Sequence, residues 1–182
     1  MCKVYIVRHG KVDFNWRSWC DSKGFDSDAQ EYDRSPLTDD TYSISELADS
    51  KIYISTLPRT KATALMLFGQ KEFTISELIH EVPLRSGFDT KLKLPHWFWC
   101  ALGRFLWYMN HSRQPESRKL SRKRAKQFVE LICKDDIDCT VVTHGFFMHT
   151  LLSELKTAGF SIPKTHAKYS NGECIVAERR VS

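Results

Sequence analysis

The feature that most restricts the fold is an apolar run at the start of the chain that ends abruptly in Arg8, His9 and Gly10. Residues 3–7 (KVYIV) are β-branched, aromatic or apolar after the first lysine, which is typical of a buried strand in a parallel sheet. In open α/β sheets, ligands bind beyond the carboxyl ends of the strands, which is where Arg8 and His9 fall. Gly10 allows a sharp turn and a close approach of the main chain to a bound group. The motif therefore predicts an α/β fold with a polar site at the end of this strand.

A similar motif occurs near residue 140, where the apolar run 139–143 (CTVVT) is followed by His144 and Gly145. A single histidine at a strand end is more often a hydrogen-bonded structural residue than a catalyst. Two copies of the motif change this interpretation, because parallel strands deliver both imidazoles to the same edge of a sheet. We therefore expect His9 and His144 to face each other across one pocket.

Strands and helices alternate along the rest of the chain, which indicates an α/β domain. The expected strands are residues 3–7, 51–56, 73–75, 139–142 and 173–178, and the expected helices are residues 38–48, 58–68, 94–109, 116–134 and 146–158. Residues 11–40 are rich in Asp, Ser and aromatic residues and are expected to form a long active-site loop with little regular structure. A chain of 182 residues fits a single domain, residues 1–182.

The aromatic stretch 96–109 (HWFWCALGRFLWYM) is too short to span a bilayer and carries Arg104 near its centre. A helix lying in a membrane interface is one interpretation. A helix packed over the mouth of a pocket is favoured, as part of a lid-like insertion at about residues 86–115.

Composition narrows the classes of partner. The formal net charge of +5 suits an anionic ligand but does not by itself indicate one. The basic stretch 118–126 lacks interleaved aromatic residues and any known binding motif, so it is interpreted as a solvated helix face rather than a nucleic-acid site. We expect neither a nucleic-acid partner nor a membrane partner, and the sequence gives no indication of oligomeric state. The six cysteines are scattered without CxxC spacing, and no secretory signal opens the chain, so a reducing, cytoplasmic location is expected.

Cationic groups at strand ends predict a phosphate pocket. Arg59 follows the expected strand 51–56 at the start of a helix, where its guanidinium and main-chain N–H groups can converge on one oxyanion. His9 and His144 have no acidic partner at the spacing of metal ligands, and neighbouring arginines would repel a divalent cation. We therefore expect no metal and no cofactor.

These motifs together resemble those of the histidine phosphatase superfamily, which has the phosphoglycerate-mutase-like fold. The residues that carry the resemblance, in family order over nearly the whole chain, are Arg8-His9-Gly10, Asn15, Pro36-Leu37-Thr38, Ser55 through Arg59 with Thr63-Ala64, Glu81, and Thr143-His144-Gly145. Residues 81–84, the aromatic stretch and Glu116-Ser117 are similar to a bacterial phosphatase branch of the family. The resemblance implies a three-layer α/β/α fold with a mostly parallel central sheet.

The resemblance also implies a mechanism of two phosphoryl transfers. Neutral His9 would attack phosphorus and form a phosphohistidine. Arg8, Arg59 and His144 would surround the equatorial oxygens and stabilise their charge. Asn15 matches a polar position of the phosphate pocket in the family.

Glu81 would protonate the leaving oxygen and then assist the attack of water on the phosphoenzyme. From strand and loop positions alone, Glu77 is an alternative carboxylate for this role, and the family motif favours Glu81. Phe146 departs from the family pattern, because a second glycine frequently follows the second histidine. This departure bears on the substrate more than on the reaction.

The resulting prediction is a metal-independent phosphomonoester hydrolase of the histidine acid phosphatase type that acts on a small-molecule phosphate ester. One alternative is phosphotransfer of the phosphoglycerate mutase type, although the mutases of the family carry longer insertions between the acid and the second histidine. Another is a protein that binds a phosphorylated ligand without turnover. Residues 97–108 could shape the pocket rim and favour an apolar or aromatic leaving group, or they could pack as a lid on the core.

Overall fold

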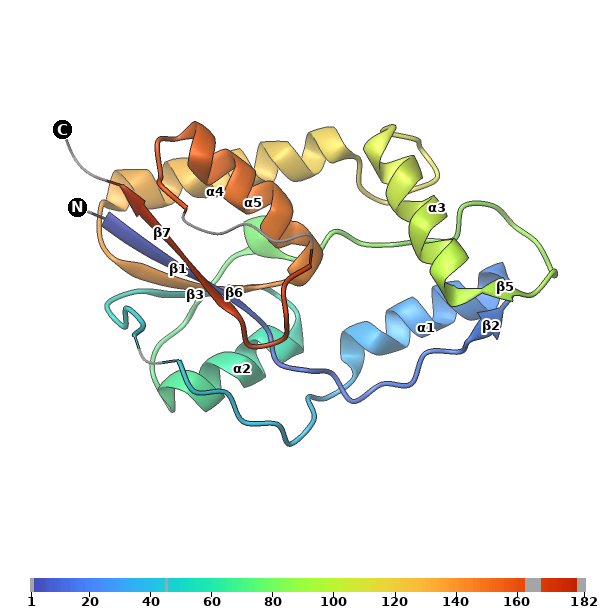
Figure 1. Ribbon diagram of the computed structural model, residues 1–182, viewed down its shortest axis with the longest axis horizontal. Coiled ribbons are helices and arrows are strands. Elements are labelled where there is room, and N and C mark those ends of the chain that lie inside the picture. Colours follow the sequence, from blue (N-terminus) through green and yellow to red (C-terminus); the bar gives the residue numbers. More distant parts are fainter. Residues whose placement is uncertain (1, 45, 163–167, 180–182) are drawn as a thin grey trace.

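The core of the computed structural model is a five-stranded sheet with the strand order β4-β3-β6-β1-β7 (Figure 1). Its strands are β1 (Cys2–Arg8), β3 (Ile52–Ile54), β4 (Thr74–Ile75), β6 (Cys139–Thr143) and β7 (Cys174–Arg179). All neighbouring pairs are parallel except β1 and β7, which are antiparallel. The structure describes residues 2–44, 46–162 and 168–179. The mostly parallel sheet is as predicted.

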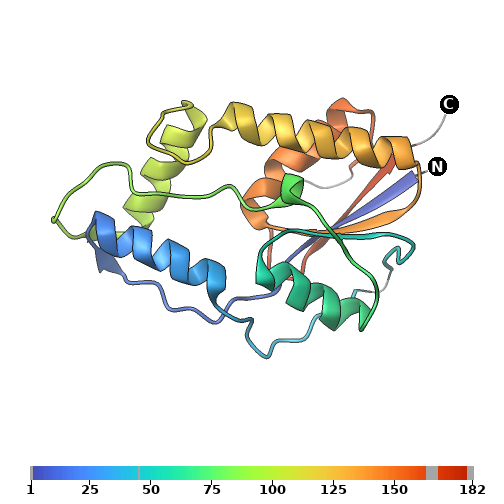
Figure 2. The ribbon, with the colours of Figure 1, turned by 180° about the vertical axis from the view of Figure 1, so that it is seen from behind.

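Helices cover both faces of this sheet, as Figures 1 and 2 show from opposite sides. They are α2 (Pro58–Phe68), α4 (Arg118–Asp135) and α5 (Gly145–Thr157). Because successive side chains of a strand point to opposite faces, Ile6 and Val141 pack in the larger cluster with α4 and α5. Val7 and Val142 pack in a second cluster with α2. These two cores make the α/β/α layers and confirm the predicted fold class.

The register of β1 and β6 determines where the site forms. The two strands pair in parallel with Arg8 opposite Thr143. The N–H of His9 then donates to the carbonyl oxygen of Thr143 over 2.9 Å. His9 and His144 therefore leave the sheet side by side at the same edge.

A smaller unit lies beyond this edge of the sheet, away from both termini (Figure 1). It consists of β2 (Trp19–Cys20), α1 (Ser22–Arg34), β5 (Leu94–Pro95) and α3 (His96–Tyr108). The 3-10 helix η1 (Glu77–Ile79) lies in the chain between α1 and β5. Phe25 of α1 and Trp99 of α3 are fully buried against Cys20. Within the described residues, no helix is both long and apolar enough to cross a membrane.

Two predictions for the first part of the chain were wrong. Residues 11–40 were expected to be a loop but contain β2 and α1. The helix α1 is mostly polar and buries only Ser22, Phe25 and Asp28, so its apolar stripe of Phe25, Ala29 and Tyr32 is narrow. Its N-terminus is capped by Asp21, whose side chain accepts from the N–H of Gly24 over 2.8 Å.

The helix expected at 38–48 is also absent from the described residues of that segment; residue 45 lies outside them. The chain is held there by tertiary hydrogen bonds instead of helical ones. The N–H of Thr38 donates to the carbonyl oxygen of Lys11 over 2.9 Å. The carbonyl oxygen of Ala48 accepts from the hydroxyl of Thr140 over 2.7 Å.

Candidate active site

His9 is buried at the end of β1, with 2 % of its surface exposed. Its Nδ1 lies 2.6 Å from the carbonyl oxygen of Gly10. Because a carbonyl oxygen can only accept, Nδ1 carries the proton of the neutral ring and Nε2 has a free lone pair. Burial, followed by the charges of Arg59 and Arg8, lowers the pKa of His9 to about 3. His9 is thus an uncharged imidazole with one nitrogen available as a nucleophile.

His144 is fully buried beside His9, and the ring centroids are 5.1 Å apart. Nε of Arg59 donates to Nδ1 of His144 over 3.2 Å. Nε2 of His144 therefore carries the proton, and it lies 2.6 Å from the hydroxyl oxygen of Ser55. Burial, and next the Arg59 charge, hold the pKa of His144 well below its usual range. Both ring nitrogens thus contact protein groups, whereas sequence reasoning expected His144 to contact phosphoryl oxygens.

Arg59 enters the pocket from the first turn of α2 and is itself buried. Besides His144, its guanidinium contacts two residues of α1. Nη1 lies 2.9 Å from Oδ1 of Asp33, and the guanidinium carbon lies 5.0 Å from the ring centroid of Tyr32. The carboxylate of Asp33 thus forms an ion pair with Arg59, the arginine that is predicted to bind phosphate.

Arg8, the last residue of β1, also lines the pocket. Its Nη1 donates to the main-chain oxygen of Tyr169. Its Nε is buried and has no hydrogen-bond partner in the described part of the chain. A Cβ at Gly145 would lie 2.8 Å from this Nε, so only a glycine at this position provides space for the guanidinium. A buried donor without a partner is costly, which favours a ligand that accepts there.

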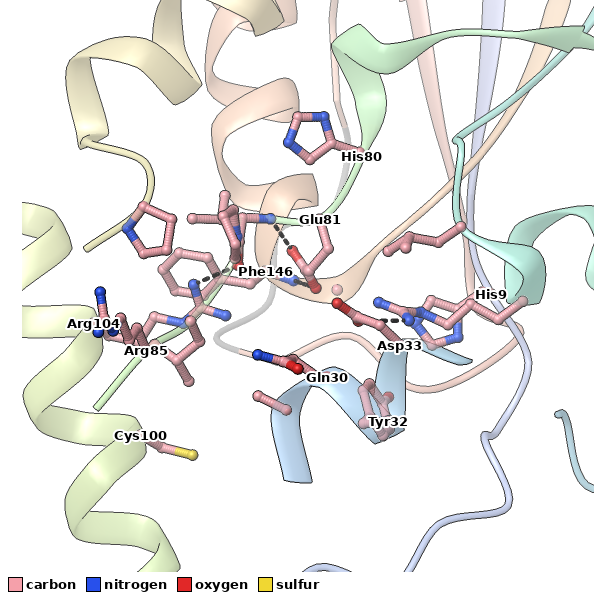
Figure 3. Close-up of a pocket in the computed structure, with 18 of the residues that line it drawn as sticks. His9, Gln30, Tyr32, Asp33, His80, Glu81, Arg85, Cys100, Arg104 and Phe146 are labelled. Carbon is pink, nitrogen blue, oxygen red and sulfur yellow. Dashed lines mark hydrogen bonds and ion pairs between the residues drawn. The ribbon is translucent and has the colours of Figure 1, made fainter. Parts of the chain in front are cut away.

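Glu81 follows η1 and reaches the N-terminus of α5. Its carboxylate accepts from the N–H groups of Val82 at 2.9 Å, Phe147 at 3.0 Å and Phe146 at 3.4 Å. These donors fix the carboxylate at the pocket wall (Figure 3). Glu77, the alternative from strand and loop positions, is exposed and does not line the pocket.

The pocket lined by His9, Arg8, Arg59 and Glu81 has a volume of about 970 Å³ and extends from β1 to α3. Helix α3 lines it with His96, Cys100 and Arg104, while Trp99 and Trp107 are buried and Trp97 is exposed. The aromatic stretch is thus both a packed helix and a wall of the pocket, but its pocket-facing side is not aromatic.

Two predicted site residues do not line the pocket: Asn15 is exposed, and His144 is fully buried beside His9. Tyr32 and Asp33 line the pocket but were absent from the sequence prediction. They were missed because α1 itself was not expected. The helical spacing of Phe25, Ala29 and Tyr32 is the sequence signal that could have indicated this helix. No group of three or more His, Cys, Asp or Glu residues suited to a metal ion occurs among the described residues.

Solved structures with the same fold include several phosphatases. A mutant phosphoserine phosphatase from Entamoeba histolytica, in complex with phosphoserine, is 18% identical with a TM-score of 0.57, covering 97% of this chain and 90% of that one. A putative alpha-ribazole-5'-P phosphatase from Escherichia coli is 13% identical with a TM-score of 0.57, covering 99% and 95%. A mycobacterial glucosyl-3-phosphoglycerate phosphatase is 18% identical with a TM-score of 0.54, covering 97% and 89%.

Comparison with curated proteins finds no match to this sequence. The profile of the histidine phosphatase superfamily (branch 1), however, matches residues 4–179, which is nearly the whole chain. That range contains both strand-end histidines, the predicted site arginines Arg8 and Arg59, and Glu81. This protein therefore belongs to branch 1 of the histidine phosphatase superfamily.

Proposed function

We propose that this protein is a metal-independent phosphomonoesterase that forms a phosphohistidine on Nε2 of His9. The observation that carries the proposal is the hydrogen bond from Nδ1 of His9 to the carbonyl oxygen of Gly10. It leaves Nε2 unprotonated in the pocket, and the low pKa of His9 keeps the ring neutral. A neutral imidazole held between two arginines is suited to attack a phosphorus atom whose oxygens carry negative charge.

Arg8 and Arg59 bind the phosphoryl oxygens in this scheme. Nε of Arg8 is buried and lacks a hydrogen-bond partner among the described residues, and the guanidinium of Arg59 is buried. The charges of both arginines act on His9. Preorganised cations stabilise the charge that develops on the equatorial oxygens during in-line transfer. His144 contributes by holding Arg59 in place through Nδ1.

Glu81 is assigned the proton transfers. In the first step, the Nε2–P bond forms, the ester P–O bond breaks, and the leaving oxygen takes a proton from the Glu81 carboxyl group. In the second step, water attacks phosphorus and gives a proton to the Glu81 carboxylate, the P–N bond breaks, and inorganic phosphate leaves. The position of Glu81 in the wall of the pocket supports this assignment. The substrate is a small-molecule phosphate ester, and residues 86–115, which include α3, form the lid over its leaving group.

The test is the hydrolysis of p-nitrophenyl phosphate by the wild-type protein and by His9→Ala. We expect phosphate release by the wild type, its loss in His9→Ala, and a trapped phosphoenzyme that carries phosphorus on His9. His111→Ala is the matched control, because His111 is exposed and outside the pocket. Binding of phosphate without turnover would instead indicate a phospho-ligand-binding protein. Transfer of the phosphoryl group to an added phosphoglycerate in preference to water would indicate a mutase.

A further inference from the structure

The end of the pocket opposite His9 contains a second cationic group, Arg104. Figure 3 shows Arg104 and Arg85 on one side of the pocket and His9 on the other, with Glu81 between them. Arg104 lies on the face of α3 that lines the pocket and is partly buried. Because Arg104 lies on the far side of Glu81 from His9 in this view, it would lie beside the leaving group of an ester bound at His9 rather than beside the phosphoryl group.

The contacts of Arg104 leave its charge unpaired. Nη1 donates to the main-chain oxygen of Val82 over 3.1 Å. The guanidinium carbon lies 3.6 Å from the ring centroid of Phe146, so the aromatic ring covers one face. Among the described residues, no carboxylate lies within 4 Å of Arg104. Glu81 and Glu116 attract it only over longer distances.

Among the described residues, Arg8 also has no carboxylate partner, but it lies beside His9 and is assigned to the phosphoryl group. Three other arginines near the pocket are paired. Arg59 pairs with Asp33 at 2.9 Å, and Arg124 pairs with Glu116 at 2.8 Å. Arg85 is exposed and lies 3.6 Å from a carboxylate oxygen of Asp26. A partly buried cation without a paired anion is unfavourable unless a ligand supplies the anion.

Phe146 gives this arrangement a basis in the sequence. It stands where the family pattern frequently has a glycine, which has no ring on which a guanidinium could stack. Stacking on an aromatic ring holds an arginine while its remaining N–H groups stay free to donate. The departure at Phe146 and the cation at Arg104 therefore form one feature of this chain.

We propose that Arg104, held by Phe146, binds a second anionic group on the leaving portion of the substrate. The substrate is then a phosphomonoester that also carries a carboxylate or a second phosphate, both of which a planar guanidinium can bind through two N–H groups. This inference rests on the proposed phosphatase function. It replaces the expectation of an apolar or aromatic leaving group, which was based on the aromatic residues of α3.

Matched substrate pairs test the proposal. Phosphoserine and phosphoethanolamine differ only in the carboxylate, and propanediol bisphosphate and propanediol monophosphate differ only in the second phosphate. In one of the two pairs, we expect the wild-type kcat/KM to be at least about 10-fold higher for the ester that carries the additional anionic group. A charge-assisted hydrogen bond to Arg104 would stabilise its bound state by that amount. A preference in the first pair identifies a carboxylate as the bound group, and a preference in the second identifies a phosphate.

Variants of Arg104 assign the preference to this side chain. Arg104→Met should lower the preference ratio by about 10- to 100-fold, and Arg104→Lys should restore part of it. Arg118→Met is the matched control, because Arg118 also lies over an aromatic ring, Tyr108 at 4.4 Å, but outside the pocket. Its ratio should equal that of the wild type.

Two failures can be told apart. If the wild type hydrolyses both members of each pair equally well, the second anionic site is wrong while the phosphatase function stands. If it hydrolyses none of these esters and not p-nitrophenyl phosphate, the phosphatase function is wrong. Calorimetry on the His9→Ala variant, with and without Arg104→Met, then decides on the subsite. Tighter binding of the doubly anionic member that is lost with Arg104→Met supports it, and equal affinities overturn it.

Discussion

Nε of Arg59 donates a hydrogen bond to Nδ1 of His144 over 3.2 Å, which fixes the protonation of that ring. Since the arginine can only donate, Nδ1 is unprotonated, and Nε2–H of the neutral ring donates to Ser55 at 2.6 Å. His144 thereby acts as a support for the guanidinium. The two histidines, which look equivalent in the sequence, have different surroundings. His9 has a free nitrogen in the pocket, and His144 has none.

The first prediction concerns the pH dependence of stability. Burial and the arginine charges lower the pKa of His9 to about 3 and that of His144 well below 6.5, the value of a free histidine. At a pH between the pKa of each histidine in the folded protein and its pKa in the unfolded chain, the unfolded chain binds a proton that the folded protein excludes. The free energy of unfolding should therefore fall as the pH drops below about 6.5, by up to about 1.4 kcal/mol per pH unit for each histidine.

Urea unfolding at a series of pH values from neutral to mildly acidic measures this slope. His9→Asn should reduce the slope by up to about 1.4 kcal/mol per pH unit, because it removes one excluded proton. His144, His96 and His149, whose pKa values are also lowered by burial, should keep the rest of the slope. His111→Asn, which changes an exposed histidine outside the pocket, should leave it unchanged. A slope that is the same with and without His9 would contradict the buried neutral imidazole.

Sequence patterns correctly predicted those segments whose local amino-acid pattern matches their environment in the folded protein. The runs before His9 and His144 are buried on both faces of the sheet, so they are apolar throughout and recognisable as strands. Helix α1 has its few apolar residues at helical spacing, but its composition is mostly polar, because most of its residues face solvent or the pocket. The segment at 38–48 shows the opposite error. It has a capping residue and helix-compatible composition, but hydrogen bonds to Lys11 and Thr140 hold it outside a helix.

The site residues that could be predicted are likewise those placed by the central sheet. His9, Arg8, Arg59 and Glu81 follow strands or a short loop near the sheet edge, and the structure brings them to one pocket. Asn15 belongs to a segment whose path depends on the packing of α1 and α3, and it ends outside. Asp33 and Arg104 could not be predicted for the same reason, since their positions depend on how the smaller unit packs against the sheet.

The second prediction concerns Asp33, whose carboxylate occupies Nη1 of Arg59 at 2.9 Å. A phosphoryl group must compete with this carboxylate for the guanidinium. Because the Asp33 side chain is 44% exposed, solvent screens the pair, and the competition should be modest. Asp33→Asn should lower the inhibition constant of inorganic phosphate by roughly 2- to 10-fold.

Asp89→Asn is the control for this change, since Asp89 pairs with Arg113 and does not line the pocket. Its inhibition constant should match that of the wild type. Weaker phosphate inhibition in Asp33→Asn would show that Asp33 orients Arg59 for the ligand instead of competing with it.

The third prediction is that Gly145→Ala separates binding from stability. The new Cβ would lie 2.8 Å from Nε and 3.1 Å from Cζ of Arg8, so the guanidinium must move. Alanine is a better helix former than glycine by about 1 kcal/mol, and residue 145 opens α5, so the folded state should not lose stability. The inhibition constant of inorganic phosphate should rise about 10-fold while the urea midpoint stays the same or increases.

Gly159→Ala should show the reverse pattern. Gly159 follows α5 with a φ of +88°, where a side chain is strained, and a Cβ there meets no atom within 4 Å. That variant should be less stable by about 1–2 kcal/mol and bind phosphate normally. Equal phosphate affinity in Gly145→Ala and the wild type would remove Arg8 from the phosphate site.

The last prediction separates the two steps assigned to Glu81. In Glu81→Gln the amide oxygen can still accept from the N–H groups of Val82 and Phe147, which share one carboxylate oxygen at 2.9 and 3.0 Å, so the fold should be kept. The amide cannot transfer a proton, so turnover of an alkyl phosphate should fall by about 10²- to 10⁴-fold. Since p-nitrophenolate leaves without protonation, its release in the first turnover should be nearly normal, and the phosphoenzyme should then accumulate. Stopped-flow absorbance would record this as a burst followed by a slow steady state.

Glu77→Gln, four residues earlier on the exposed side of η1, should behave like the wild type. Loss of the burst itself in Glu81→Gln would mean that this carboxylate positions the phosphoryl group rather than transferring protons.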